Sequence, residues 1–274
     1  MGRRLGENAG RAGIFRARDL SYAAAGTLGR RDYGLTREQA LANARAIVDA
    51  TDLPVSADLE NAFGYSPESV METIRLAAAA GLAGCSTEDA AGGTEPYDLS
   101  LATERLAAAV QAARALPFPF VLTARAENYT RGRANLDDTI RRLQAYEKAG
   151  ADVLFAPGLP DLASIRTVCA AVSKPVNVVG SMQDGKLSVA ELAAAGVKRI
   201  SLAAAFYRAA MTGLRDAARE VHEKGTFSFA ARTMSSPEFN EFMQSVSHCC
   251  LLLNGPSERR TRTDRTRNTP YTVA

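Results

Sequence analysis

Short apolar segments alternate with amphipathic ones through most of this chain, and that alternation restricts its fold more than any other feature. The apolar segments have the length and composition of buried strands, and the segments between them show helical periodicity. Strands that are apolar on both faces and separated by helices indicate a parallel sheet covered on both sides. Seven strands are expected, near residues 17–23, 54–58, 82–87, 119–125, 152–156, 175–179 and 198–202.

The ends of the expected helices carry matching signals. Thr36 and Gln39 form a capping box ahead of one helix. Gly81, Gly150 and Gly196 each follow an alanine just before an expected strand, where a glycine can take the left-handed conformation that ends a helix. The repeated order of helix, glycine and strand predicts a series of β/α units.

Chain length narrows the choice of fold. The chain has 274 residues, and about 250 residues is typical of a (β/α)8 TIM barrel. A TIM barrel is therefore the first expectation, and a doubly wound open sheet is the alternative. No glycine-rich nucleotide-binding motif follows the first expected strand. The polar, basic stretch before residue 12 offers no eighth strand, so the barrel is predicted to lack its first strand or to have a divergent one.

Three regions are expected along the chain. Residues 1–230 should form a catalytic barrel domain, residues 231–255 a C-terminal helical extension and residues 256–274 a basic, disordered tail. The tail holds five arginines against Glu258 and Asp264, which accounts for the whole net charge of +3. The remaining chain is close to neutral, so no nucleic-acid partner is expected.

Hydropathy indicates the compartment. No apolar run approaches the roughly 18 residues of a membrane span. The N-terminal stretch MGRRLGENAGRAG lacks the apolar core of a signal peptide. We therefore expect no membrane association and a cytoplasmic protein.

The supply of sulfur and nitrogen ligands restricts the possible metal sites. His222 and His248 are the only histidines, and both come late in the chain. A histidine-rich zinc site and a Ser-His-Asp triad are therefore disfavoured. The four cysteines show no metal-binding spacing and read as free buried thiols. A bound metal would need oxygen ligands, which favours Mg²⁺, with Mn²⁺ possible.

Charged residues stand at the ends of successive expected strands. Active sites of TIM barrels lie at the C-terminal ends of the strands. Asp58 and Glu60 are two residues apart and point to the same side of their strand. Candidate residues at the other strand ends are Ser21, Glu88, Arg125 and Asn177.

These residue types suggest a particular chemistry. Clustered carboxylates hold a hard divalent cation, which can act as a Lewis acid on the carbonyl oxygen of a 2-oxo acid. The guanidinium of Arg125 can bind a carboxylate or a developing enolate. The set therefore indicates a site that stabilises an enolate, whichever bond is broken to form it.

Three segments carry a resemblance to a known family. PVSADLENAFGYSPESV, AGLAGCSTEDAAG and LTARAENYTRGR resemble the metal-site segments of the isocitrate lyase/phosphoenolpyruvate mutase superfamily, and AGADVLFAPGL and KPVNVV fit the same pattern. The resemblance covers roughly residues 12–230. It implies a (β/α)8 barrel with magnesium, acting on a small-molecule substrate. It also implies a homodimer or homotetramer whose subunits exchange their last helix.

The resemblance also implies roles for individual residues. Asp58, Glu60 and Glu88 would surround the metal, and Arg125 and Glu88 would be catalytic. Substrate-binding residues would be Ser21, Tyr22 and Ala23, through their backbone, together with Asp58, Arg125 and Asn177.

The chain departs from the family pattern in three places. The lyases carry a Lys-Lys/Arg-Cys-Gly-His loop whose cysteine is the acid/base, whereas this chain has DAAGGTEPYDLSL there. Ala156 stands where the mutases have a histidine. The family's first strand with its Trp-Asp segment is missing, and this chain contains no tryptophan.

These departures decide between the possible reactions. Decarboxylation of a β-keto acid needs an electron sink and little else, so loss of the loop base damages it least. We therefore expect a magnesium-dependent lyase acting on a small 2-oxo carboxylate, as an oxaloacetate decarboxylase or another carbon–carbon lyase. Tyr97, Glu95 and Asp98 are the candidates for an unfamiliar base. A phosphonopyruvate-type mutase or hydrolase and an inactive, truncated family member remain the alternatives.

Overall fold

A single parallel sheet forms the centre of the molecule. The computed structural model describes residues 17–19, 21–93, 95–180, 185–244 and 272–273. Each strand in this part of the chain pairs in parallel with the next one in sequence. The strands are β1 (Ala17–Asp19), β2 (Val55–Asp58), β3 (Gly84–Glu88), β4 (Val121–Arg125), β5 (Val153–Phe155), β6 (Val176–Val179), β7 (Arg199–Ser201) and β8 (Thr272–Val273).

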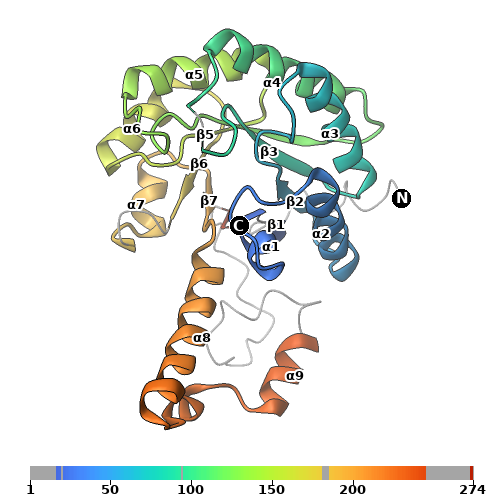
Figure 1. Cartoon of the computed structure of the whole chain (residues 1–274). Helices are drawn as coiled ribbons and strands as arrows, with labels where there is room; N and C mark the ends of the chain where they lie inside the picture. The colour runs from blue at the N-terminus through green and yellow to red at the C-terminus, as the bar shows by residue number, and fades with distance from the viewer. Residues whose placement is uncertain (1–16, 20, 94, 181–184, 245–271, 274) are drawn as a thin grey trace, which may run out of the picture.

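Helices cover the outside of the curved sheet (Figure 1). All seven predicted strands are present, although the first, expected at residues 17–23, ends at Asp19 and a helix begins at Ser21. The alternation of strands and helices is that of a (β/α) barrel. Among the described residues no pairing joins β1 to β8, so the ring of strands is not closed there. The helices are α1 (Ser21–Thr27), α2 (Arg37–Ala50), α3 (Pro67–Ala79), α4 (Leu99–Arg114), α5 (Leu136–Ala149), α6 (Leu162–Ala171), α7 (Val189–Ala194), α8 (Ala205–Lys224) and α9 (Ser236–Gln244), with a 3₁₀ turn η2 (Ser228–Arg232).

The eighth strand comes from the opposite end of the chain to the one that sequence reasoning considered. Thr272 and Val273 pair with β7, opposite Arg199 and Ile200. The rest of the predicted tail, residues 256–271 and 274, lies outside the described residues. Two residues of a segment that reads as a disordered tail therefore add a strand to the sheet.

Local sequence explains where the helices begin and end. The predicted capping box of α2 is formed, with the Thr36 side chain accepting a hydrogen bond from the Gln39 N–H. Helix α5 ends at Gly150, whose φ of 105° is left-handed. These ends fix the lengths of the β/α units and so the positions of the loops between them.

Strand register decides which side chains meet at the C-terminal edge of the sheet. Asp58 at the end of β2 lies opposite Ser86 on β3. Glu88 at the end of β3 lies opposite Arg125 at the end of β4. The parallel direction of these strands therefore brings the predicted site residues to the same edge.

Small side chains allow the helices to pack closely on the sheet. Ala44, Ala77 and Ala109 are fully buried between helices and strands. Gly84 is needed at the start of β3, because a Cβ there would lie 2.4 Å from the Val121 carbonyl oxygen. The alanine-rich composition thus supports a compact helical layer.

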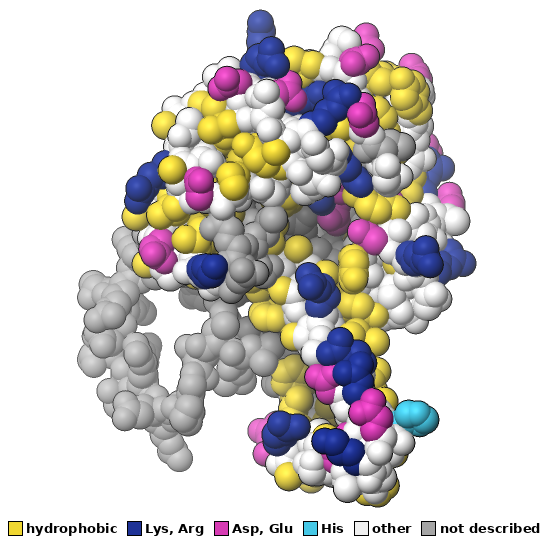
Figure 2. All heavy atoms as spheres, turned by 60° about the vertical axis from the view of Figure 1, so that its left-hand side comes forward, with side chains coloured by type: hydrophobic (Ala, Val, Ile, Leu, Met, Phe, Trp, Pro, Cys, Tyr) yellow, Lys and Arg dark blue, Asp and Glu magenta, His cyan; other side chains and the backbone are white. Residues whose placement is uncertain are grey.

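Helices α8 and α9 form an arm that projects from the barrel (Figure 1). Helix α8 has no buried residue along its 20 residues. Figure 2 shows hydrophobic side chains interspersed with charged ones along this arm, which carries His222. In the part of the chain that is described, no helix is both long enough and apolar enough to cross a membrane.

Candidate functional site

Two carboxylates and one guanidinium meet at the C-terminal ends of β2, β3 and β4. Arg125 Nη1 lies 2.8 Å from Glu88 Oε1 and 3.2 Å from Asp58 Oδ2. The side chain of Glu88 is 2% exposed, so little water screens these contacts. The three residues converge as the sequence predicts, but a guanidinium stands between the two carboxylates.

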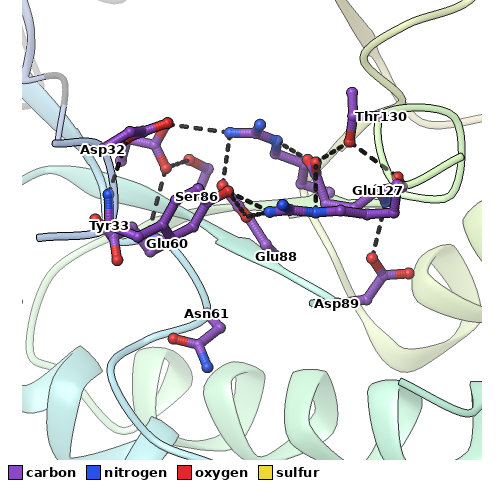
Figure 3. A network of polar contacts seen from close by, with 12 residues as sticks. Asp32, Tyr33, Glu60, Asn61, Ser86, Glu88, Asp89, Glu127 and Thr130 are labelled. Atoms are coloured by element: carbon purple, nitrogen blue, oxygen red, sulfur yellow. Dashed lines mark hydrogen bonds and ion pairs between the residues drawn. The ribbon is translucent and has the colours of Figure 1, made fainter. Parts of the chain in front are cut away.

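A second arginine and a further glutamate extend this cluster (Figure 3). Arg125 Nε donates to Glu127 Oε1. Arg131, in the loop between β4 and α5, has its Nη2 at 3.7 Å from Glu88 Oε2 and its Nε at 3.9 Å from Glu127 Oε2. Two arginines therefore alternate with two buried glutamates.

The loop between α1 and α2 adds Asp32 and Tyr33 to the site. Tyr33 Oη donates to Glu88 Oε2 at 2.7 Å and accepts from Arg131 Nη2 at 2.5 Å. Its ring lies 5.1 Å from the Arg131 guanidinium. The ring also packs on Gly92, where a Cβ would come within 2.5 Å of it. Tyr33 thereby links three loops above the carboxylates.

Sequence reasoning did not select Asp32, Tyr33 or Arg131. They belong to loops, which show no hydrophobic periodicity. One signal was present for Arg131, since it stands in the polar segment that follows β4, and such βα loops build barrel active sites. Asp32 and Tyr33 lie between two helices and carried no comparable signal.

Glu60 is buried among other acids. Its N–H donates to Asp58 Oδ1 at 3.4 Å, and its Oε1 makes no hydrogen bond to any described residue. Burial raises the pKa of Glu60 to about 7, and repulsion from Asp58 and Asp32 adds to the rise, while a hydrogen bond with Ser21 opposes it. Burial likewise raises the pKa of Asp32, as does repulsion from Asp58.

The electrostatic balance at Glu88 is different, because cations flank it. Burial is the largest influence and raises the pKa of Glu88 to about 8. The charge of Arg125 opposes this rise, whereas Glu127 and Asp58 increase it. Ionisation of Glu60 and Glu88 in the folded protein therefore costs free energy, and a bound cation would reduce this cost.

The donor set fits a hard divalent cation. Five carboxyl groups face two guanidinium groups, and they belong to Asp32, Asp58, Glu60, Glu88 and Glu127. The orphaned oxygen of Glu60 is an available ligand. In the present side-chain arrangement, no three acid, histidine or thiol groups of the described residues stand close enough to share a metal ion. The chemistry of these residues thus suits magnesium, while Arg125 supplies the positive charge between Asp58 and Glu88.

The predicted backbone site at Ser21, Tyr22 and Ala23 forms the first turn of α1. Backbone N–H groups of a first helical turn have no partner within the helix. Ser21 is buried and shares a hydrogen bond with Glu60, so this turn lies beside the carboxylates. The Tyr22 ring instead packs edge-on against Tyr207 of α8, with centroids 6.2 Å apart.

Asn177 lies on β6 and is fully buried. Its Nδ2 donates to Ser201 Oγ at 3.0 Å, and its Oδ1 has no hydrogen bond to a described residue. Among the described residues, no hydrogen bond or ion pair joins Asn177 to the carboxylate cluster, so its predicted role in substrate binding remains a prediction.

Among the described residues, none of the three candidates for a loop base contacts the carboxylate cluster. Glu95 is exposed and forms an ion pair with Arg133. Tyr97 Oη accepts a hydrogen bond from Asn61 Nδ2 at 2.8 Å, and Figure 3 shows Asn61 apart from the carboxylate network. Asp98 is the N-cap position of α4. The structure therefore gives none of them a position next to Glu88 or Arg125.

The buried Asp89 connects the backbone of the site to helix α5 through hydrogen bonds. Asp89 Oδ1 accepts from the Glu127 N–H at 2.8 Å. Its Oδ2 accepts from Arg142 Nη1 at 2.9 Å and from Tyr146 Oη at 2.5 Å. This network fixes the backbone of Glu127. It thereby fixes the position of the Arg125 guanidinium, which donates a hydrogen bond to Glu127.

Comparisons with known proteins identify the family of this chain. The sequence profile of the family described as phosphoenolpyruvate phosphomutase matches residues 4–222. The 2-methylisocitrate lyase of Escherichia coli K12 is 30% identical over 234 residues, which are 82% of this chain and 78% of that protein. Oxaloacetate decarboxylase 2 of Pseudomonas fluorescens Pf0-1 is 28% identical over 73% of this chain and 70% of its own length.

Solved structures show the same fold. A provisionally assigned lyase/mutase from Burkholderia cenocepacia J2315 is 46% identical, with a TM-score of 0.81 over 86% of this chain and 93% of that one. A phosphonopyruvate hydrolase in complex with oxalate and Mg²⁺ is 24% identical, with a TM-score of 0.71 over 88% of this chain and 86% of that one. With the profile match over most of its length, the chain belongs to the phosphoenolpyruvate phosphomutase family, within the isocitrate lyase/phosphoenolpyruvate mutase superfamily.

Proposed function

We propose that this protein is a magnesium-dependent carbon–carbon lyase that acts on a small 2-oxo carboxylate through an enolate. The observation that carries the proposal is the rim of five carboxyl groups and two guanidinium groups that the C-terminal ends of β2, β3 and β4, the loops after them and the loop between α1 and α2 bring together. The curated relatives that are lyases and decarboxylases support the same reaction class.

The residues of the rim have distinct roles in this proposal. Asp58, Glu60 and Glu88 would hold the cation, with Asp32 beside them. When bound, the cation would polarise the substrate's carbonyl group and so stabilise negative charge in the enolate. Arg125, which pairs with Asp58 and Glu88, would bind the substrate carboxylate once these acids had another counter-charge.

Decarboxylation is the form of the reaction that this site can perform with the groups it has. Cleavage of an alcohol substrate requires a base for its hydroxyl group. The loop between β3 and α4 carries no cysteine or histidine, and Glu95 and Tyr97 of that loop contact Arg133 and Asn61 instead of the carboxylate cluster. Loss of CO₂ from a β-keto acid needs only the electron sink, so an oxaloacetate-type substrate suits the site best.

A direct assay tests this function. Purified protein is incubated with a panel of 2-oxo acids that includes oxaloacetate, and pyruvate release is compared with a protein-free control containing the same Mg²⁺. Turnover should require Mg²⁺ and should disappear with a chelator. Asp58→Asn keeps the side-chain size but removes a negative charge, and it should lower kcat/KM by about a hundredfold or more.

Two results would contradict the proposal. Turnover that survives both the chelator and Asp58→Asn would exclude the carboxylate cluster as the site. Release of phosphate from phosphonopyruvate, without pyruvate release from any 2-oxo acid of the panel, would favour a hydrolase.

We also propose that the protein assembles with a second copy of itself through α8. The exposed apolar side chains of this helix are Phe206, Met211, Leu214 and Val221. At 100° per residue they fall on one side of the helix. A helix of 20 residues with one apolar face and no buried residue requires a partner surface. A matching helix from a second subunit would supply it.

A further inference from the structure

We propose that Arg131 is a second anion-binding residue of the site and makes it select substrates with a second carboxylate. The inference rests on the proposed function and adds a specificity determinant to it. Arg125 was the arginine that the sequence pointed to, yet the two guanidinium groups differ in how many of their donors are in use.

Arg125 is heavily engaged by the protein itself. Its Nη1 contacts both Glu88 and Asp58, at 2.8 and 3.2 Å, and its Nε donates to Glu127. The side chain is 16% exposed. Its main effect in this state is to neutralise the acids around it.

Arg131 is equally buried but less engaged. Its side chain is 14% exposed, and its Nε is buried without a hydrogen bond to any described residue. Its nearest carboxylate oxygens, on Glu88 and Glu127, are 3.7 and 3.9 Å away, beyond hydrogen-bonding distance. A buried guanidinium donor without an acceptor is unfavourable, and an anionic ligand would satisfy it.

Tyr33 fixes the position of this guanidinium. Its ring lies 5.1 Å from the guanidinium carbon of Arg131, and its hydroxyl accepts from Nη2 at 2.5 Å. Tyr33 has a φ of 58°, a left-handed value that a non-glycine residue adopts only when its surroundings enforce it. Gly92, on the next loop, leaves room for the ring. Two loops therefore hold Arg131 in place before any ligand is bound.

The two guanidinium groups lie on either side of one carboxylate, that of Glu88. Each contacts a different oxygen of the same Glu88 carboxylate, Arg125 on Oε1 and Arg131 on Oε2. A substrate bound at the first guanidinium by one carboxylate thus has the second guanidinium within reach of another. A 2-oxo monocarboxylate would leave the Arg131 donor unsatisfied.

Two probes separate this role from general binding. Oxalate uses both of its carboxylates in one chelate, whereas 3,3-difluorooxaloacetate can chelate through its 2-oxo group and the adjacent carboxylate and still present its second carboxylate, two carbons away from the 2-oxo carbon. Their affinities are measured by calorimetry in the presence of Mg²⁺ for wild-type protein and for Arg131→Gln. We expect the substitution to lower the affinity for 3,3-difluorooxaloacetate by about tenfold or more and to change the affinity for oxalate by no more than about twofold.

Arg133→Gln is the matched control, because Arg133 lies in the same loop but is 56% exposed and pairs with Glu95. It should change neither affinity. Arg131→Lys is the second variant, for use if Arg131→Gln fails to fold. Lysine keeps the charge but lacks the planar fork of donors, so the affinity for 3,3-difluorooxaloacetate should fall selectively, by less than in Arg131→Gln.

The outcomes distinguish the inference from the function on which it rests. If a folded Arg131 variant loses affinity equally for both probes, or for neither, the role of Arg131 is overturned and the lyase proposal stays intact. If wild-type protein with Mg²⁺ binds neither probe, the proposed function is overturned and this inference with it. Selective loss of 3,3-difluorooxaloacetate supports the inference.

Discussion

Glu60 shows most clearly how single residues in this site are held in unfavourable states. It is 5% exposed, lies beside two other acids and has a left-handed φ of 51°. One of its oxygens makes no hydrogen bond to a described residue. A structural carboxylate would be paired, so this one is better explained as a group arranged to bind a ligand.

The raised pKa values predict a pH dependence of stability for the metal-free protein. Glu60 and Glu88 have ordinary pKa values of 4.5, which rise in the folded protein to about 7 and about 8. Between the ordinary pKa of 4.5 and the raised pKa values, the folded state therefore binds more protons than the unfolded state. The free energy of unfolding should fall as the pH rises through this range. Above about pH 8 the stability contributed by the two protonated glutamates should be lost.

Glu60→Gln tests the contribution of that residue. The variant should be more stable than wild type by on the order of 1–3 kcal/mol at high pH without metal, because a buried, repelled charge is removed. It should also bind Mg²⁺ more weakly. Urea unfolding in chelator across the pH range measures the first effect and calorimetry the second. Glu95→Gln, on an exposed ion pair, is the control; an unchanged pH dependence in Glu60→Gln would refute the explanation.

At the scale of elements, the loop between β2 and α3 carries Glu60 and is itself strained. Ala62 and Phe63 also have left-handed φ values, of 62° and 56°. Arg105 of α4 holds this loop by donating to the Gly64 carbonyl at 2.6 Å and to the carbonyls of Asn61 and Tyr65. A buried guanidinium from one helix therefore stabilises the shape of a loop that precedes another.

Replacing Arg105 should release this loop. Arg105→Met leaves three carbonyl groups without their donor and should lower the free energy of unfolding by about 2–4 kcal/mol. Mg²⁺ affinity should also fall, because Glu60 loses its fixed place. Adding Ala62→Gly should recover part of both losses, since glycine adopts the left-handed conformation at less cost, by about 1 kcal/mol.

Arg114→Met is the control for this pair of variants, because Arg114 ends the same helix but is 49% exposed in its ion pair with Asp152. It should cost no more than about 1 kcal/mol. Urea unfolding gives the stabilities. If Ala62→Gly recovers nothing, Arg105 does not act by holding strained backbone.

At the scale of the whole molecule, the barrel buries the apolar faces of its helices, whereas the projecting arm leaves its apolar side chains exposed. Barrel helices α2 to α7 bury theirs against the sheet, whereas α8 buries no residue. The arm also touches the site region indirectly, since Tyr207 of α8 packs on Tyr22 and Gly26 of α1. Assembly through α8 would therefore steady the first turn of α1.

Leu214→Glu should disrupt the proposed assembly. Leu214 is 60% exposed at the centre of the apolar face of α8, so a charge there costs little in an isolated subunit but opposes burial against a second copy. Light scattering should show wild type as a dimer or tetramer and the variant as a monomer. Arg219→Ala, in an exposed i,i+4 ion pair on the same helix, should leave the mass unchanged. A monomeric wild type would refute the assembly.

The sequence by itself determined the order of the elements and the acids at their ends. Hydrophobic periodicity, the cap at Thr36 and the glycine after α5 are local signals, and the structure has the helices that they predict. Because parallel neighbouring strands end at one edge, the sequence also placed Asp58, Glu88 and Arg125 together.

Only the tertiary structure decided how that edge is completed. Tyr33 and Arg131 are 98 residues apart and meet over Glu88 because two loops close on the same strand ends. Strand β8 likewise comes from a segment whose composition predicts a disordered tail, and it pairs with the edge of β7. Loop positions and edge pairings depend on contacts between distant segments, and no local periodicity records such contacts.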